Sequence, residues 1–153
     1  SDDGNRIAVG SPLAQAGNYY YKAGGVEIYE LVNNVWVQIG NTIFGTEYYG
    51  NFGSDVAISG NGQYVIIGSP NDDTGTGETA ISNTGEVKVY QEVSGTWTQI
   101  GQTFSGVSLD DSSGKSVVIN YDGSVIAFGT PKHDTTIANE GKIEIFQYKG
   151  NTW

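Results

Sequence analysis

The side chains best suited to chemistry gather in one acidic loop in the middle of the chain. The segment Asn71-Asp72-Asp73-Thr74-Gly75, followed by Glu78, offers several oxygen atoms of the kind that Ca²⁺ prefers as ligands. Aspartate and asparagine also fill loops simply because they form turns. A calcium loop and a plain acidic turn are therefore both open interpretations, and no cofactor besides calcium is expected. The candidate metal ligands are Asn71, Asp72, Asp73 and Glu78, with the pair Asp110-Asp111 as a second acidic group.

Tyrosines form two runs that could bind a ligand. Tyrosine supplies rigid contact area with an apolar body and a polar tip, so such runs can stack on sugar rings or anchor a protein partner. The alternative is that these rings cover sheet edges or pack between sheets. The candidate ligand-binding residues are Tyr19, Tyr20, Tyr21, Tyr48 and Tyr49.

Few residues of the chain could carry catalysis. There is no cysteine and only one histidine, His133, which lies in a polar loop and is interpreted as a surface residue. No nucleophile-elbow pattern accompanies it. Asp72 and Asp73 could serve a glycosidase, but adjacency in sequence does not give the separation across a sugar that this chemistry needs. We therefore expect no catalytic residues, and a chain that is not an enzyme.

The net charge of −10 excludes some partners. This charge repels phosphate backbones and so removes the electrostatic attraction on which nucleic-acid binding depends. No run of apolar residues approaches the roughly eighteen that a membrane-spanning helix needs. We expect neither nucleic acid nor a membrane span.

A repeat of about sixty residues sets the architecture that must position these side chains. Upstream of each copy of its clearest motif lies an Asx-Gly pair followed by an apolar run, which predicts a two-residue type I′ hairpin. The three copies of the motif are Gly10-Ser11-Pro12, Gly68-Ser69-Pro70 and Gly129-Thr130-Pro131. The three pairs are Asp3-Gly4, Asn61-Gly62 and Asp122-Gly123.

Each repeat unit predicts four antiparallel strands. The strand ending at Ile58 should pair with the one starting near Tyr64, and Val65-Ile66-Ile67 reads as a strand buried on both faces. A tryptophan returns in every copy, where it can fill the gap between neighbouring sheets. The repeat units span 1–58, 59–119 and 120–153, and the tryptophans are Trp36, Trp97 and Trp153.

The sequence predicts an all-β chain of β-propeller-type four-stranded antiparallel blades, because a lone sheet of this kind cannot cover its own faces. The chain holds about two and a half blades, an incomplete ring where propellers typically use four to eight. We expect the 153 residues to be a segment of a longer chain, or to complete a ring with other copies. Further blades, from the same chain or from other copies, are thus expected partners.

The repeat resembles the FG-GAP family of repeats, which builds integrin α-subunit-like propellers. Phe52-Gly53, Gly68-Ser69-Pro70 and Gly85-Glu86-Val87-Lys88-Val89-Tyr90 carry the resemblance, which covers essentially the whole chain. The calcium loop that many FG-GAP repeats hold between their first two strands is replaced by the Asx-Gly turn in all three copies. The resemblance implies an extracellular or surface location and a role in adhesion or ligand presentation.

The function expected is therefore that of a non-catalytic interaction or structural module that presents loops to a protein or glycan ligand. The alternative from another class is part of a carbohydrate-active enzyme, a hydrolase or lyase, on a propeller scaffold. The long connections after each Gly-Ser/Thr-Pro motif are the expected binding face, because functional residues concentrate on loops held by a rigid scaffold.

Overall fold

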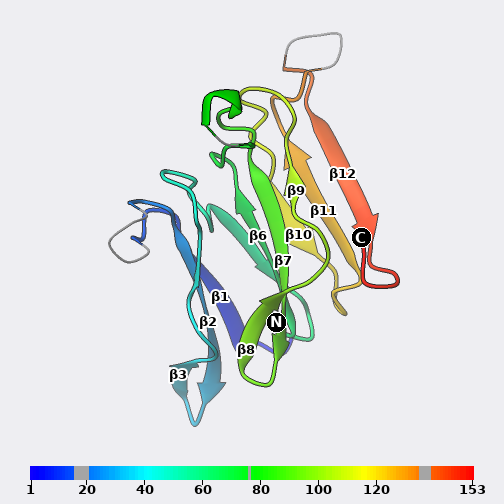
Figure 1. Cartoon of the computed structure of the whole chain (residues 1–153). Coiled ribbons are helices and arrows are strands. Elements are labelled where there is room, and N and C mark those ends of the chain that lie inside the picture. Colours follow the sequence, from blue (N-terminus) through cyan, green and yellow to red (C-terminus); the bar gives the residue numbers. More distant parts are fainter. Residues whose placement is uncertain (16–20, 76, 135–138) are drawn as a thin grey trace.

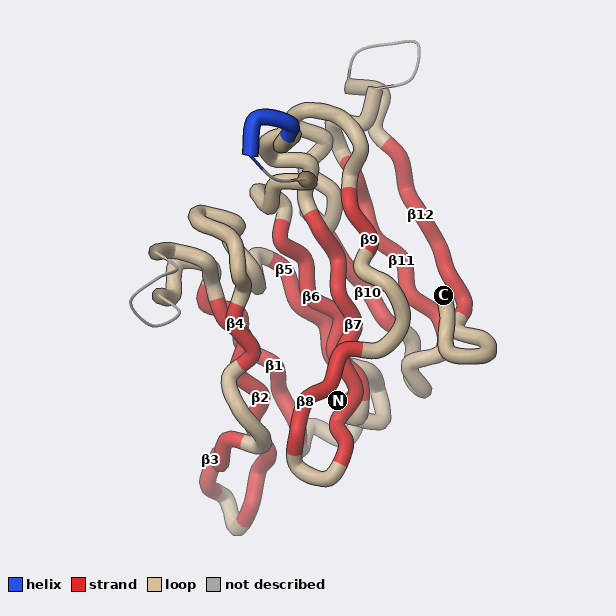
Figure 2. The backbone as a smooth tube through the Cα atoms, viewed as in Figure 1, coloured by secondary structure: helices blue, strands red, loops and turns tan. Residues whose placement is uncertain are grey.

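The structure, a computed structural model, describes residues 1–15, 21–75, 77–134 and 139–153. Within these residues the secondary structure is antiparallel β-sheet with a single turn of 3₁₀ helix, η1 (Gly77–Thr79), as Figure 2 shows. The expected all-β, nearly helix-free chain is confirmed. No helix in the described ranges has the length and apolar character that crossing a membrane requires.

In the described part of the chain the strands form three separate sheets (Figure 1). The first sheet holds β1 (Arg6–Ser11), β2 (Gly25–Val32), β3 (Val35–Gln38) and β4 (Ile43–Phe44). The second holds β5 (Asp55–Ile58), β6 (Tyr64–Ser69), β7 (Glu86–Val93), β8 (Thr96–Gln99) and β9 (Phe104–Ser105). The third holds β10 (Ser116–Ile119), β11 (Val125–Thr130) and β12 (Lys142–Gln147).

The predicted four-stranded meander is found in the second sheet, in the order β5-β6-β7-β8. Ile58 of β5 pairs with Val65 of β6, so the predicted hairpin is confirmed. The first sheet starts at β1, which matches β6, and the third ends at β12, which matches β7, among the residues described. The sheets therefore do not coincide with the repeat units. Strand β5 is the last strand of the first repeat unit, yet it pairs with β6 of the second unit.

Two apolar cores join the three sheets. Val26 and Ile28 of β2 pack with Val65 and Ile67 of β6 between the first and second sheets. Ile66, on the other face of β6, packs instead into the core shared with the third sheet. Because successive residues of a strand point to opposite faces, this explains why β6 is a continuous apolar run. The prediction that β6 is buried on both faces is confirmed.

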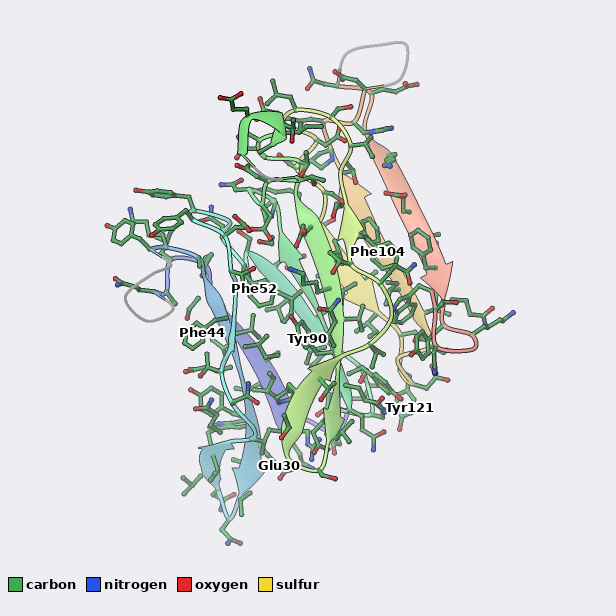
Figure 3. All side chains as sticks on the ribbon, in the orientation of Figure 1. Glu30, Phe44, Phe52, Tyr90, Phe104 and Tyr121 are labelled. Carbon is green, nitrogen blue, oxygen red and sulfur yellow. The ribbon has the colours of Figure 1, made fainter. Side chains whose placement is uncertain are left out.

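Aromatic side chains complete both cores. Phe52, in the loop before β5, meets Tyr90 of β7 edge-on with ring centroids 6.4 Å apart (Figure 3). In the other core, Phe104 lies 4.4 Å from Phe146 and 5.1 Å from Phe128, measured between ring centroids. These contacts hold each sheet against its neighbour without disulfides.

The predicted type I′ geometry of the Asx-Gly turns is wrong. Such turns need positive φ at both central residues, whereas here Gly62 has φ 71° and Asn61 is not among the positive-φ residues. The Asn61 carboxamide oxygen instead accepts hydrogen bonds from the Ser59 hydroxyl and the Gln63 N–H. This side-chain capping is typical of an Asx turn, and the loop between β5 and β6 is longer than the two residues of a type I′ hairpin. Two positive φ values occur instead at Ser94-Gly95, before β8.

The repeated tryptophans join neighbouring sheets, as predicted, at two of three positions. Trp97 is 5% exposed and its indole Nε1 donates to the carbonyl oxygen of Ile39, the residue after β3 of the first sheet, at 3.0 Å. Trp153 makes the equivalent bond to the carbonyl oxygen of Ile100, the residue after β8 of the second sheet, at 3.4 Å. Trp36 differs, because 43% of its surface is exposed.

Candidate functional site: a tyrosine cluster on the loops

The two loops that carry the predicted tyrosines meet at the end of the first sheet. The backbone N–H of Tyr49 donates to the carbonyl oxygen of Tyr21, and the two rings meet edge-on with centroids 5.7 Å apart. Tyr21, Tyr48 and Tyr49 are 46%, 61% and 55% exposed. The structure therefore brings these three tyrosines to one exposed place, while Tyr19 and Tyr20 lie outside the described residues.

A lysine completes this group. The Lys22 Nζ atom lies 5.2 Å from the centroid of the Tyr21 ring and 5.7 Å from that of Tyr49. Both distances are within the range at which an ammonium group is attracted to an aromatic face. We call Tyr21, Lys22, Tyr48 and Tyr49 the tyrosine cluster. It is a half-exposed aromatic surface with one positive charge.

The backbone beneath the cluster is unusual for such large side chains. Lys22 and Tyr49 have φ values of 55° and 59°, in the left-handed region that bulky residues avoid. The repeat places Asn83 and Asp110 at the matching positions of the second and third sheets, with φ values of 51° and 64°. There the Asn83 amide donates to the Asp110 carboxylate at 3.0 Å.

Comparison of these two pairs shows that the backbone of the tyrosine cluster is costly for the residues it carries. Asparagine and aspartate adopt the left-handed conformation readily, whereas other residues lose roughly 1 kcal/mol each. The same backbone thus carries an ordinary polar pair at one junction and a costlier lysine–tyrosine pair at the other. Residues held in unfavourable backbone regions cluster at functional sites, so the Lys22–Tyr49 pair marks the candidate site.

The predicted calcium ligands are not gathered around one point. Asp72 is buried, with 1% of its surface exposed, whereas Glu78 lies on η1 and is exposed. Asp73 accepts a hydrogen bond from the Asn83 N–H at 2.8 Å, and Asn71 donates its own N–H to the carbonyl of Gly50. In the described ranges, no three His, Cys, Asp or Glu side chains converge in a way that could hold a metal ion.

Asp72 is instead a buried carboxyl between the first and second sheets. A Cβ atom added to Gly50 would lie 1.8 Å from its Oδ1, so the carboxyl fits only against glycine. Burial, together with the nearby carboxylate of Glu86, raises the pKa of Asp72 to about 7, although Lys88 partly offsets this. Lys88 itself pairs with Glu86 at 2.6 Å. Asp72 therefore keeps its proton up to a pH well above the range in which a carboxyl usually ionises.

The corresponding place between the second and third sheets holds a paired acid and histidine. The Asp111 carboxylate accepts hydrogen bonds from the N–H groups of Val107 and Ser108, both at 2.9 Å. The His133 Nδ1 lies 3.4 Å from this carboxylate. Burial alone would raise the pKa of Asp111, but these hydrogen bonds and His133 outweigh it, so the pKa is lowered.

The interpretation of His133 as a surface residue is wrong. Its side chain is only 14% exposed, because it packs on Asp111, whose side chain is fully buried. Nothing local to either residue signals this contact, which spans 22 positions. Alignment of the repeat units is consistent with the contact, because His133 matches Asp72, Asp111 matches Gly50, and Gly50 lies against Asp72.

Comparison with known proteins leaves the function to be argued from this geometry. No model of a known protein family matches the chain, and no match is found among curated proteins.

Proposed function

We propose that the chain is a non-catalytic interaction module whose tyrosine cluster binds a protein or glycan ligand. The observation that carries this proposal is the Lys22–Tyr49 pair, where a lysine and an exposed tyrosine ring occupy backbone positions that favour asparagine and aspartate. Three tyrosines on two loops supply amphipathic contact area of the kind that sugar rings and protein side chains bind.

The proposed architecture is a propeller of the FG-GAP-like type. Its support is the face-to-face packing of three successive sheets, each joined to the next by the same tryptophan bond and the same kind of apolar core. The resemblance of the repeat to FG-GAP repeats adds an extracellular or surface location to the proposal. Both statements rest on the repeat and are open to test.

Two observations favour binding over the carbohydrate-active alternative. Asp72, whose raised pKa would suit a general acid, and Asp111, which lies beside His133, are buried between sheets with 1% and 0% of their surface exposed. His133 is held against Asp111. A general acid must reach the proton that it transfers, and the carboxyls of Asp72 and Asp111 are closed off from solvent.

The test exploits the repeat. A double variant, Lys22→Asn with Tyr49→Asp, copies the Asn83–Asp110 pair onto the first junction, so it should fold while losing the Tyr49 ring and the Lys22 charge from the tyrosine cluster. The control is Leu109→Ser, because Leu109 matches Tyr48 and is 65% exposed. Arrays of oligosaccharides and peptides select the probe, and calorimetry then compares the three proteins. We expect a loss of about tenfold or more in affinity for the double variant alone.

Equal affinity of the double variant and the original chain for the selected probe would overturn the proposed binding site. Cleavage of a selected oligosaccharide by the chain would instead favour the enzyme alternative.

A further inference from the structure

Lys22 differs from the other half-buried cations of the chain. All seven basic residues lie in the described ranges, and those that are half-buried are Arg6, Lys22, Lys88 and Lys142. The salt bridges of this group join Arg6 to Glu30 at 2.9 Å, Lys88 to Glu86 at 2.6 Å and Lys142 to Glu144 at 3.1 Å. Within the same ranges no carboxylate forms a salt bridge with Lys22, whose ammonium lies against two tyrosine rings instead. Its charge is therefore partly withdrawn from water without a counter-ion.

The repeat gives this position a different residue elsewhere. Asn83 and Asn139 match Lys22 in the second and third sheets, with φ values of 51° and 55° beside the 55° of Lys22. Asp110, the partner of Asn83, matches Tyr49. The formal charge of the pair therefore changes from −1 at Asn83–Asp110 to +1 at Lys22–Tyr49, on a chain whose net charge is −10. A positive pair thus replaces a negative one at the tyrosine cluster.

The surroundings of the Lys22 ammonium indicate what kind of group it would bind. The rings of Tyr21 and Tyr49 attract the ammonium, which lies 5.2 and 5.7 Å from their centroids, but they do not neutralise its charge. A charge that is partly removed from water is best satisfied by an opposite charge that also accepts its hydrogen bonds. A ligand that carries a carboxylate therefore gains an interaction with Lys22 that a neutral ligand lacks.

The spacing within the cluster limits the shape of the ligand. The Lys22 Nζ atom lies within 5.7 Å of both ring centroids, and these centroids are themselves 5.7 Å apart. A ligand that pairs with Nζ and packs on an exposed tyrosine must therefore hold its charge and its apolar face close together. An acidic sugar does so in one rigid ring, because its carboxylate is attached to the ring whose C–H groups pack on tyrosine. A peptide must order two side chains to present the same groups, which costs conformational entropy.

We infer that the tyrosine cluster binds an acidic sugar, whose carboxylate pairs with Lys22 and whose C–H face packs on the exposed tyrosines. This inference rests on the proposed function and specifies the ligand class of the same site. The net charge of −10 opposes a long polyanion. The acidic sugar therefore stands at the end of an otherwise neutral oligosaccharide.

Matched oligosaccharides test the ligand class. The first two pairs are lactose extended with glucuronic acid or glucose, and lactose extended with galacturonic acid or galactose. The third pair is sialyl-lactose and lactose. Calorimetry at pH 7, where the carboxylates are ionised, measures the dissociation constant of each probe, and a panel of acidic peptides is measured alongside. We expect the acidic member of at least one pair to bind about tenfold more tightly than its neutral partner.

Variants at Lys22 assign this preference to its charge. Lys22→Asn introduces the residue of the second and third sheets on a backbone that favours it, so the chain should fold, which circular dichroism verifies. This variant keeps all three tyrosines and should bind the acidic and neutral members of a pair equally. Lys22→Arg keeps the charge and should keep the preference. The control is Lys149→Asn, which removes an exposed lysine after β12 and should leave the preference unchanged.

Equal binding of the acidic and neutral members of every pair would overturn the inference. The proposed binding site would still stand in that case if the Lys22→Asn/Tyr49→Asp variant weakened the binding of both members. A preference for the acidic member that survives Lys22→Asn would also overturn the inference, because the carboxylate would then bind elsewhere. Binding of acidic peptides in preference to every oligosaccharide would overturn it as well and would leave a protein as the ligand of the cluster. A chain that binds none of the probes would contradict both the inference and the proposed function.

Discussion

The indole of Trp97 donates a hydrogen bond of 3.0 Å to the backbone carbonyl of Ile39, 58 residues earlier in the chain. A Cβ atom added to Gly40, the next residue, would lie 2.8 Å from the same indole. The ring therefore occupies a place that a glycine in the preceding sheet leaves open. This bond links two sheets that share no strand.

Trp97→Phe should destabilise the chain by about 1–3 kcal/mol, because it removes the bond and leaves the Ile39 carbonyl without this donor. Trp36→Phe is the matched control, since Trp36 is 43% exposed, and it should cost no more than about 0.5 kcal/mol. Urea unfolding followed by circular dichroism measures both. Equal losses for the two variants would contradict the structural role of Trp97.

Gly68→Ala should cost about 3 kcal/mol or more, because the new methyl would lie 2.0 Å from the Gly114 carbonyl oxygen and force the sheets apart. Gly129→Ala, at the matching place in the third sheet, meets only the Ser116 hydroxyl at 3.1 Å, which can rotate away. Denaturant midpoints compare the two variants. Equal losses for the two variants would contradict the close packing of the second sheet on the third at Gly68.

Stability should fall as the pH rises from about 4 to about 7. In this window the unfolded chain ionises Asp72 near its usual pKa of 3.8, while the folded chain keeps the proton up to a pKa of about 7. The free energy of unfolding should drop by up to about 1.4 kcal/mol per pH unit and level off above pH 7. Asp72→Asn, which mimics the protonated acid, should flatten this slope.

Glu78→Gln, on the exposed turn η1, serves as the control for this pH series and should leave the slope unchanged. Chemical unfolding at a series of pH values gives the result. A slope that survives Asp72→Asn would assign the effect to other groups.

The acid–histidine pair of one junction should be transferable to the other. Gly50→Asp alone should destabilise by about 2 kcal/mol or more, because its Cβ would lie 1.8 Å from the Asp72 Oδ1 and would add a second buried acid. Adding Asp72→His copies the Asp111–His133 pair and should recover most of the loss. A double-mutant cycle measures the coupling. Additive losses would mean that the two junctions are not equivalent.

The strand pattern was predictable because local signals and packing agree. Val65-Ile66-Ile67 is apolar at every position, and each of its faces meets a different core. The turn at Asn61-Gly62 was mispredicted as type I′ because the asparagine side chain competes for the backbone N–H groups that a two-residue hairpin would use. Side-chain capping of this kind depends on Ser59, outside the dipeptide that gives the hairpin signal.

The site was less predictable. The tyrosine runs of the sequence do bring three exposed rings together at Tyr21, Tyr48 and Tyr49, while their binding of a ligand stays a prediction. Lys22 was missed, since its contact with the rings depends on a backbone conformation that brings two loops together. Asp72 looks like a loop ligand in sequence and is buried only because Gly50, far along the chain, leaves room for it. Such tertiary contacts leave no local pattern.

Fluorine NMR of the chain labelled with fluorotyrosine tests the central claim most directly. The probe is the oligosaccharide or peptide selected on the arrays, and Tyr121 is the internal control, because it is 63% exposed but lies in the turn before β11, at the opposite end of the sheets (Figure 3). On titration, the resonances of Tyr21, Tyr48 and Tyr49 should shift together with one dissociation constant while that of Tyr121 stays in place. Shifts of Tyr121 as large as those of the cluster, or saturation with no shift at Tyr21, Tyr48 and Tyr49, would contradict the assignment of ligand binding to the tyrosine cluster.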